Sequence, residues 1–218
     1  MSLKTELPEK ISRRLKSGTI TKQKIWKFVM ELNEFSEQRL DSTALISDDT
    51  TISYREMFDG WMRYAKVFSG LGITETDHSR VGLLSGRDTG SVYSLYGLNI
   101  TGASVSLLHE LDILDHKRWD QLIIKEGITD LLLTDRKLTR SGLLFICENM
   151  DRLGIRNVIV LHEGKDESFL RLKRIRGVLF MEELLEKYAD HDISFGSDRP
   201  ADDAIIFHTS GKIGRAHV

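Results

Sequence analysis

The sequence predicts an α/β fold: a doubly wound, mostly parallel sheet with flanking helices. From about residue 80 onward, short apolar runs alternate with amphipathic stretches of roughly 10 to 15 residues, the pattern of strands joined by crossover helices. Such strands pair in parallel, because right-handed crossovers return the chain to the same end of the sheet. The chain has only two prolines, Pro8 and Pro200, and no internal repeat, so nothing indicates a repeat array.

Composition excludes several classes of protein. The chain has 218 residues, 40% of them hydrophobic and 29% charged, which suffices for a globular core. Because Lys+Arg 31 balance Asp+Glu 33 to a net charge of −2, we expect no nucleic-acid partner. No apolar stretch has the length of a transmembrane segment or of a signal-peptide core. We therefore expect a cytoplasmic protein, with peripheral membrane contact left open.

The single cysteine, Cys147, lies within an apolar stretch. It cannot form an intrachain disulfide, which fits a reducing compartment. Its surroundings favour a buried core thiol over a nucleophile.

The first elements are helical and then hairpin-like. Residues 1–40 are predicted to form an amino-terminal helical segment, because apolar residues recur there at spacings of three and four. Two short runs, 44–47 and 51–53, flank Asp48 and Asp49 and predict a β-hairpin.

A long helix is expected next. Ser53 and Glu56 form a capping box at its start, and it ends near Gly70. One face carries a stripe that predicts core packing rather than a cofactor site, made of Tyr54, Phe58, Trp61, Ala65 and Phe68.

The remaining elements alternate regularly. Strands are expected at 80–84, 103–108, 128–134, 157–161 and 204–207. Helices are expected at 88–101, 115–126, 140–153 and 181–188, with a polar loop at 164–167.

A candidate phosphate-binding segment, Thr209-Ser210-Gly211, follows the last strand. In doubly wound sheets, ligands bind beyond the carboxyl ends of the strands. Hydroxyls and unhindered backbone N–H groups suit a polyphosphate, so these three residues are the predicted nucleotide-binding residues. The tripeptide alone is a weak signal, and its context must supply specificity.

Other motifs fail on spacing. Gly82, Gly86 and Gly90 do not match the dinucleotide fingerprint, and Ser85 stands one place too late for a nucleophile elbow. His109 lacks a second histidine four residues on, which excludes a zinc-protease motif. His208 is interpreted as a strand-end residue rather than a general base, and Asp202 and Asp203 as turn residues. No metal site is predicted.

The last six residues, Ile213 to Val218, match the translation of a common sequencing adapter, AGATCGGAAGAGCACACGTC. The first two adapter bases would complete the codon of Lys212. We therefore expect residues 212–218 to be adapter read-through, the alternative being a natural terminus. On this interpretation Lys212 is not a phosphate-binding lysine.

Five segments, in order, resemble the adenylate-forming (AMP-binding) superfamily, which includes acyl-CoA synthetases, peptide-synthetase adenylation domains and luciferases. Ile52 to Met57 resembles the family's "T-Y-x-E-L" helix start, and 71–73 its "L-G-V". Residues 80–84 resemble "R-V-A-I", and 101–103 resemble "x-G-A". Residues 202–211 resemble "D-D-x-A-x-I-x-x-T-S-G" with one residue fewer.

Two departures accompany this similarity. Gly82 replaces the usual alanine, and residues 104–109 lack the "P-L-x-P" pattern of many relatives. We interpret both as divergence within the family.

The resemblance implies a partial AMP-binding domain over residues 41–211, the amino-terminal part of an ATP-dependent acyl-CoA synthetase-like ligase. In such enzymes a carboxylate attacks the α-phosphate of ATP, and a thiol, usually coenzyme A, then takes the acyl group. Thr209 and Ser210 would donate to phosphate, Gly211 would permit close approach, and Mg²⁺ would spread the charge. The catalytic lysine and the metal-binding carboxylate would lie beyond Gly211, so the fragment itself is expected to be inactive.

Two alternatives stay open. One is a peptide-synthetase adenylation domain, whose partner would be a carrier protein. The other is a non-catalytic α/β binding module.

Overall fold

The computed structural model describes residues 37–47, 50–86, 88–108, 116–134, 139–161, 175–196 and 204–207. The predicted amino-terminal helix lies outside these ranges, apart from α3 (Glu37–Leu40). The predicted polar loop at 164–167 also lies outside them.

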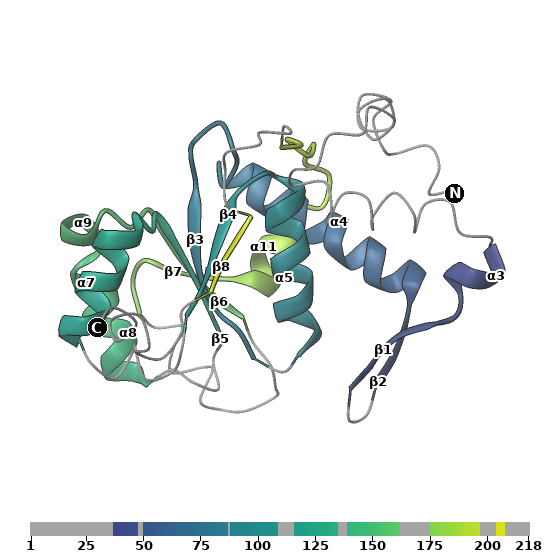
Figure 1. Cartoon of the computed structure of the whole chain (residues 1–218), viewed down its shortest axis with the longest axis horizontal. Coiled ribbons are helices and arrows are strands. Elements are labelled where there is room, and N and C mark those ends of the chain that lie inside the picture. Colours follow the sequence, from purple (N-terminus) through teal and green to yellow (C-terminus); the bar gives the residue numbers. More distant parts are fainter. Residues whose placement is uncertain are drawn as a thin grey trace, which may run out of the picture.

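A parallel sheet of six strands forms the centre of the described fold (Figure 1). Its strand order is β7-β6-β5-β3-β4-β8, and every neighbouring pair is parallel. The strands are β3 (Arg80–Leu84), β4 (Ser104–Leu107), β5 (Asp130–Thr134), β6 (Asn157–Leu161), β7 (Val178–Phe180) and β8 (Ile205–Phe207). The predicted fold class is confirmed.

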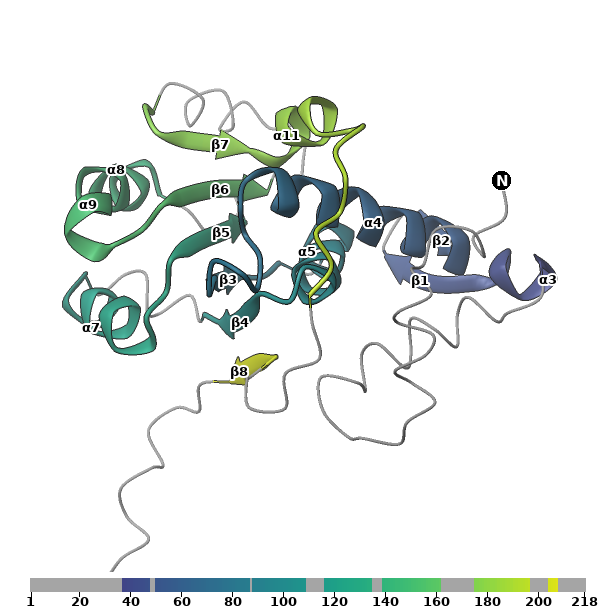
Figure 2. The same cartoon turned by 90° about the horizontal axis from the view of Figure 1, so that it is seen from above.

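Helices cover both faces of this sheet (Figure 2). One face carries α4 (Tyr54–Gly70), α5 (Thr89–Ile100) and α11 (Met181–Lys187). The opposite face carries α7 (His116–Glu126), α8 (Arg140–Glu148) and α9 (Met150–Leu153). Because side chains alternate along a strand, Leu131 and Leu133 belong to one core cluster and Leu132 to the other. Strands buried on both faces read as continuous apolar runs, which is why the sequence revealed them.

Two features differ from the prediction. The short strand β7 was not predicted, because three residues carry too little periodicity to be recognised. The predicted helix over 140–153 is two helices, α8 and α9, separated at Asn149. The Asn149 side chain donates a hydrogen bond to the Phe145 carbonyl oxygen at 2.8 Å, and such local bonds compete with helical geometry.

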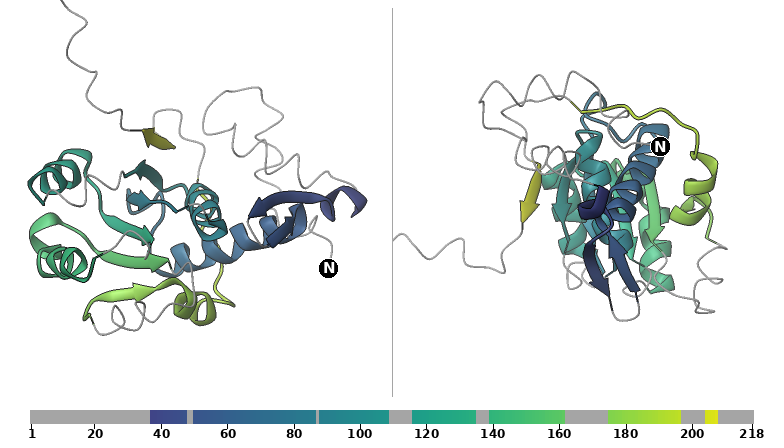
Figure 3. Two further views of the ribbon diagram at one scale, coloured as in Figure 1. Left: turned by 90° about the horizontal axis from the view of Figure 1, so that it is seen from below. Right: turned by 90° about the vertical axis from the view of Figure 1, so that its right-hand side faces the viewer.

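The predicted hairpin and capping box are confirmed. Strands β1 (Thr43–Ser47) and β2 (Thr50–Ser53) pair antiparallel and project from the end of α4, away from the main sheet (Figure 3). The Ser53 hydroxyl accepts from the Glu56 N–H at 3.2 Å, and the Ser53 N–H donates to Glu56 Oε2 at 2.8 Å. These bonds to Ser53 lower the pKa of the Glu56 carboxyl. Helix α4 therefore begins at a defined residue.

The aromatic stripe of α4 is core, as predicted. Phe58, Trp61, Ala65 and Phe68 are all buried, whereas Tyr54 is partly buried against the same core cluster. Trp61 stacks on Tyr96 with ring centroids 4.1 Å apart. Helices α4 and α5 pack closely because of their glycines. A methyl group at Gly97, for example, would lie 2.9 Å from Tyr64 Cβ.

Gly82 lies in the middle of β3. A methyl group there would lie 2.9 Å from both Leu108 Cδ1 and Leu131 Cδ2 and 3.2 Å from Ile128 Cδ1. Three large apolar side chains therefore occupy the space that a side chain at position 82 would need.

Residues 189–196, which we call the strap, run from α11 across the ends of α4 and α5 (Figure 2). Lys66 Nζ donates to the Ala189 carbonyl at 2.9 Å, and the Ser194 N–H donates to Ser69 Oγ at 2.9 Å. The Gly196 N–H donates to the Ile100 carbonyl at 2.9 Å. The strap carries the chain from the β7 side of the sheet back toward β8.

A buried carboxylate, Asp130, joins neighbouring strands at the amino end of the sheet. Its side chain is fully buried and accepts from Arg156 Nη2 at 2.6 Å and from Asn157 Nδ2 at 2.7 Å. The Thr129 hydroxyl lies 2.7 Å from Asp130 Oδ2, and Arg156 also donates to Ser79 Oγ at 2.6 Å. Each carboxylate oxygen is thus satisfied, as burial requires.

Within the described ranges, no helix combines the length and apolarity that crossing a membrane requires.

Replacing Gly102 tests the backbone contact that seats the strap. Gly102 has φ of 79°, and a methyl group there would lie 2.7 Å from Gly196 Cα. Gly102→Ala is expected to lower the free energy of unfolding by about 3 kcal/mol, through left-handed strain and displacement of the strap. Gly127→Ala is the matched control, since φ is 63° there and nothing lies within 4 Å of the added methyl. It should cost only about 1 kcal/mol, from backbone strain alone. Denaturant unfolding measures both, and equal costs would contradict the packing role of Gly102.

Replacing Asp130 tests the network at the amino end of the sheet. Asp130→Ala is expected to lower the free energy of unfolding by about 3 kcal/mol, because it leaves the Asn157 amide and the Arg156 guanidinium without their buried acceptor. Asp192→Ala, at an exposed position of the strap, should change it by less than about 0.5 kcal/mol. Urea unfolding followed by circular dichroism checks the pair. A cost for Asp130→Ala as small as the control's would contradict the network's role.

Candidate functional site

The carboxyl ends of the strands meet at one edge of the sheet. Leu107 of β4 lies opposite Leu83 of β3 on one side and Phe207 of β8 on the other. On the far side of β3, Leu84 lies opposite Leu133 of β5. We call this the carboxyl edge, and it is where ligands bind in doubly wound sheets.

Strand β8 leads directly to the predicted phosphate-binding residues. It runs parallel to β4, so its last residue, Phe207, lies at the carboxyl edge. Thr209, Ser210 and Gly211 follow within four residues but lie outside the described residues, as do His208 and the pair Asp202 and Asp203. The predicted strand is therefore confirmed, and phosphate binding by Thr209 to Gly211 stays a prediction.

The turn from β3 into α5 occupies the same edge and is fixed by hydrogen bonds. Asp88 caps α5: its Oδ1 accepts from the Ser91 N–H at 2.7 Å, and its Oδ2 accepts from the Ser91 hydroxyl at 2.8 Å. Ser91 Oγ in turn accepts from the Gly86 N–H at 2.8 Å. Gly86 therefore belongs to the capped turn, and Gly90 lies in the first turn of α5.

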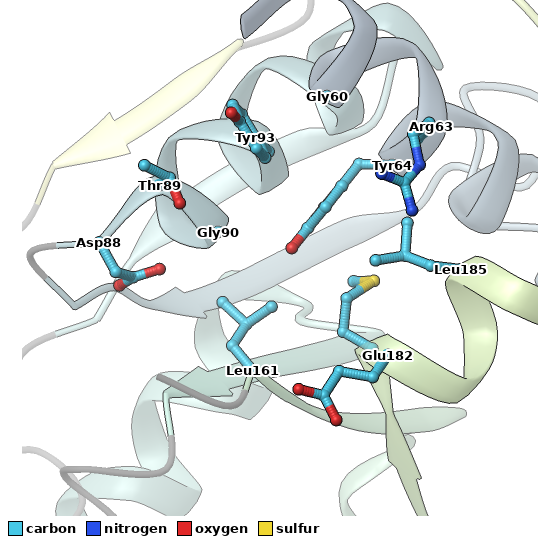
Figure 4. Close-up of a pocket in the computed structure, with 11 residues that line it drawn as sticks. Gly60, Arg63, Tyr64, Asp88, Thr89, Gly90, Tyr93, Leu161, Glu182 and Leu185 are labelled. Carbon is cyan, nitrogen blue, oxygen red and sulfur yellow. The ribbon is translucent and has the colours of Figure 1, made fainter. Parts of the chain in front are cut away.

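A cavity of about 310 Å³ opens beside this turn, between α4, α5, α11 and the end of β6 (Figure 4). Its lining combines apolar, phenolic and charged side chains with small residues. The members are Gly60, Arg63, Tyr64, Asp88, Thr89, Gly90, Tyr93, Leu161, Met181, Glu182 and Leu185. Sequence reasoning did not find this cavity, because its residues come from four separate elements. The sequence signal closest to it was the helix start at Asp88.

Tyr64 extends its hydroxyl toward the middle of this cavity (Figure 4). Burial, together with the negative charge of Asp88, raises the pKa of the Tyr64 phenol far above its ordinary value. Burial likewise raises the pKa of the Tyr93 phenol. The rings of Tyr93 and Tyr64 pack edge to face, with their centroids 5.6 Å apart. Both phenols therefore stay protonated near neutral pH and offer a donor and an acceptor each.

No group of three or more His, Cys, Asp or Glu side chains in the described ranges is arranged to hold a metal ion.

Cys147 is partly buried against the core cluster beneath α8, so the prediction of a buried thiol is correct only in part. Burial and the neighbouring Glu148 raise the pKa of its thiol. A raised pKa disfavours the thiolate, as expected of a packing residue.

Comparison with known proteins gives matches among solved structures, whereas no family model and no curated protein sequence matches the chain. Coronafacic acid ligase from Pectobacterium brasiliense superposes with a TM-score of 0.63 at 14% identity, over 87% of this chain and 33% of the ligase. A long-chain-fatty-acid-CoA ligase from Archaeoglobus fulgidus gives 0.61 at 14% identity, over 88% of this chain and 35% of that protein. A red-emitting luciferase from Phrixothrix hirtus gives 0.58 at 15% identity, over 88% and 42%.

These matches confirm the resemblance to adenylate-forming enzymes at the level of the fold. The sequence identities to these solved structures are 14 to 19%, so the matches describe the fold and not the substrate or the activity. The chain spans between 29% and 42% of the length of these solved structures. It therefore has the fold of one part of such an enzyme.

The raised pKa of Cys147 makes its alkylation slow in the folded chain. Iodoacetamide at pH 8.5 is expected to react with Cys147 at least about fivefold more slowly in the native chain than in urea, because burial lowers both the thiolate fraction and access. The native rate should continue to rise above pH 9, where an ordinary thiol approaches its plateau. Mass spectrometry of quenched samples measures it, and equal native and unfolded rates would contradict the assignment.

Proposed function

We propose that the chain is the amino-terminal part of an ATP-dependent, AMP-forming carboxylate–CoA ligase, acting in the cytoplasm. The observation that carries this proposal is the placement of β8. A parallel strand beside β4 ends at the carboxyl edge, and the sequence Thr209-Ser210-Gly211 comes almost directly after it. The fold that this chain shares with solved CoA ligases supports the same conclusion.

In the proposed reaction a carboxylate oxygen of the substrate attacks the α-phosphorus of ATP. The bond between the α-phosphorus and the oxygen that bridges it to the β-phosphorus breaks. Pyrophosphate leaves. The sulfur of coenzyme A then attacks the acyl carbon of the acyl-adenylate and loses its proton, the bond from that carbon to the phosphate oxygen breaks, and AMP leaves. Mg²⁺, when bound to the phosphates, would disperse their negative charge.

The role of this chain in that reaction is to hold the leaving phosphates. The hydroxyls of Thr209 and Ser210 would donate to non-bridging oxygens of the β- and γ-phosphates, and the Gly211 N–H would approach them without obstruction from a side chain. These donors strengthen as charge builds on the departing pyrophosphate. The rigid strand before them and the capped turn at Asp88 support such preorganisation on the described side.

The decisive experiment uses the intact gene. Sequencing past Gly211 is expected to continue the loop as Thr-Thr-Gly rather than to reach a stop codon after Val218. In the full-length protein, carboxylate-dependent exchange of pyrophosphate into ATP is the expected activity. A carrier-protein domain downstream would instead point to a peptide-synthetase adenylation domain, and a natural stop after Val218 would overturn the ligase proposal.

Thr209→Ala in the full-length protein tests the phosphate contact. It is expected to lower the rate of ATP–pyrophosphate exchange by roughly 100-fold, because one charge-stabilising donor is lost. Thr50→Ala, an exposed threonine of the hairpin, is the control and should leave the rate unchanged. An undiminished rate for Thr209→Ala would remove that residue from the site.

The 218-residue chain alone is expected to show no carboxylate-dependent exchange, because in this proposal the catalytic lysine and the metal-binding carboxylate of the ligase lie after Gly211. Detectable exchange by the purified chain would contradict this.

A further inference from the structure

The cavity between α4, α5 and α11 has a chemistry of its own, distinct from that of a phosphate loop. Its floor is apolar: Leu161 and Met181 are each 2% exposed, and Leu185 completes the surface. Tyr64 extends from α4 and places its hydroxyl over this floor (Figure 4). A volume of about 310 Å³ is at the lower end for small-molecule sites, so a ligand of few atoms fits it.

Carboxylates dominate the charge around that hydroxyl. The negative charges of Asp88 and Glu182 both raise the pKa of the Tyr64 phenol, and Asp88 has the larger effect. The positive charge of Arg63 lowers that pKa. Figure 4 shows the Arg63 guanidinium and the Asp88 carboxylate on opposite sides of the Tyr64 hydroxyl. The end of the cavity formed by Asp88 is therefore negative.

Asp88 keeps capacity for a ligand in spite of its role as a cap. Each of its oxygens accepts one hydrogen bond from Ser91, at 2.7 and 2.8 Å, and a carboxylate oxygen accepts two. Among the described residues, the Tyr64 hydroxyl has no hydrogen-bond partner, and its oxygen is held close to Gly90, where a methyl group would lie 3.2 Å from it. Two acceptors of different kinds are thus available at one end of an apolar floor.

We propose that this cavity binds a small alkylammonium ion. The ammonium group donates to the Asp88 carboxylate and to the Tyr64 hydroxyl oxygen, and the alkyl tail lies on Leu161, Met181 and Leu185. The rings of Tyr64 and Tyr93 add a favourable surface for a cation. A carboxylate group at the Asp88 end of the cavity would meet Asp88 and Glu182, and Arg63 lies on the other side of the Tyr64 hydroxyl. The Asp88 end therefore disfavours acyl substrates. This inference does not depend on the proposed ligase reaction.

Isothermal titration of the 218-residue chain with n-hexylammonium chloride tests the proposal. Saturable binding with a Kd of about 1 mM is expected for a ligand of this size. Hexan-1-ol and hexanoate are the matched neutral and anionic probes, and each should bind at least about tenfold more weakly. The amide resonances of Gly60 and Gly90 should shift with the ammonium probe, which places it in the cavity.

Two variants with a control assign the contacts. Asp88→Asn retains a side chain that caps helices as well as aspartate does, so α5 keeps its start while the charge is lost. It is expected to weaken hexylammonium binding about tenfold, and Tyr64→Phe about fivefold. Glu183→Gln removes a carboxylate from the same end of α11 without touching the cavity lining, and it should leave the affinity unchanged.

The proposal is overturned if hexan-1-ol binds as tightly as hexylammonium, if no saturable binding occurs below about 20 mM, or if Asp88→Asn keeps the full affinity. Should Asp88→Asn fail to fold, the probe series on the unmodified chain and the Tyr64→Phe variant still decide.

Discussion

The contact between two glycine backbones, Gly102 and Gly196, is the constraint on which the placement of the candidate nucleotide site depends. Strands β3 to β7 come first in the sequence, and β7 lies at one edge of the sheet. The next strand, β8, pairs with β4 at the opposite edge, so the chain has to cross back over the sheet. It does so through the strap, which passes the end of α5 where a side chain on either glycine would collide with the other's backbone. The Gly196 N–H donates to the Ile100 carbonyl and holds the end of the strap against α5. The next described residues form β8, which is in register with β4, and the Thr-Ser-Gly segment comes after this strand in the sequence.

The sequence predicted much of this fold because most elements carry strong local signals. The sheet strands buried on both faces are apolar throughout, and Ser53 and Glu56 mark a helix start by their side chains alone. Prediction failed where the outcome depended on one residue or on tertiary contacts. Helix α8 ends at Asn149, whose side chain bonds to a backbone carbonyl, and the pattern of apolar residues around it does not predict this end. Strand β7 forms by pairing with β6, a contact that a local sequence pattern does not show. The cavity was missed for the same reason, since Tyr64 and Asp88 meet only when α4 packs on α5. The Thr-Ser-Gly segment was found by motif and position, and its role rests on those two arguments still.

The two proposed sites call for opposite chemistry. The sequence Thr209-Ser210-Gly211 has hydroxyls and backbone N–H groups, the types that suit anions, whereas the cavity beside α5 offers a carboxylate and a phenol oxygen, which suit cations. Because β3 and β4 lie between β8 and the cavity side of the sheet, each set keeps its own surroundings. The sheet thus supports two separate polar environments on one rigid frame.

Gly82 has a consequence for how sequences of this fold diverge. The side-chain ends of Leu108, Ile128 and Leu131 fill the volume beside it, so a methyl group at position 82 would require them to shift. Position 82 is therefore coupled to those three positions. A side chain there requires smaller or differently branched side chains opposite, and exchanging one residue without the others should cost stability.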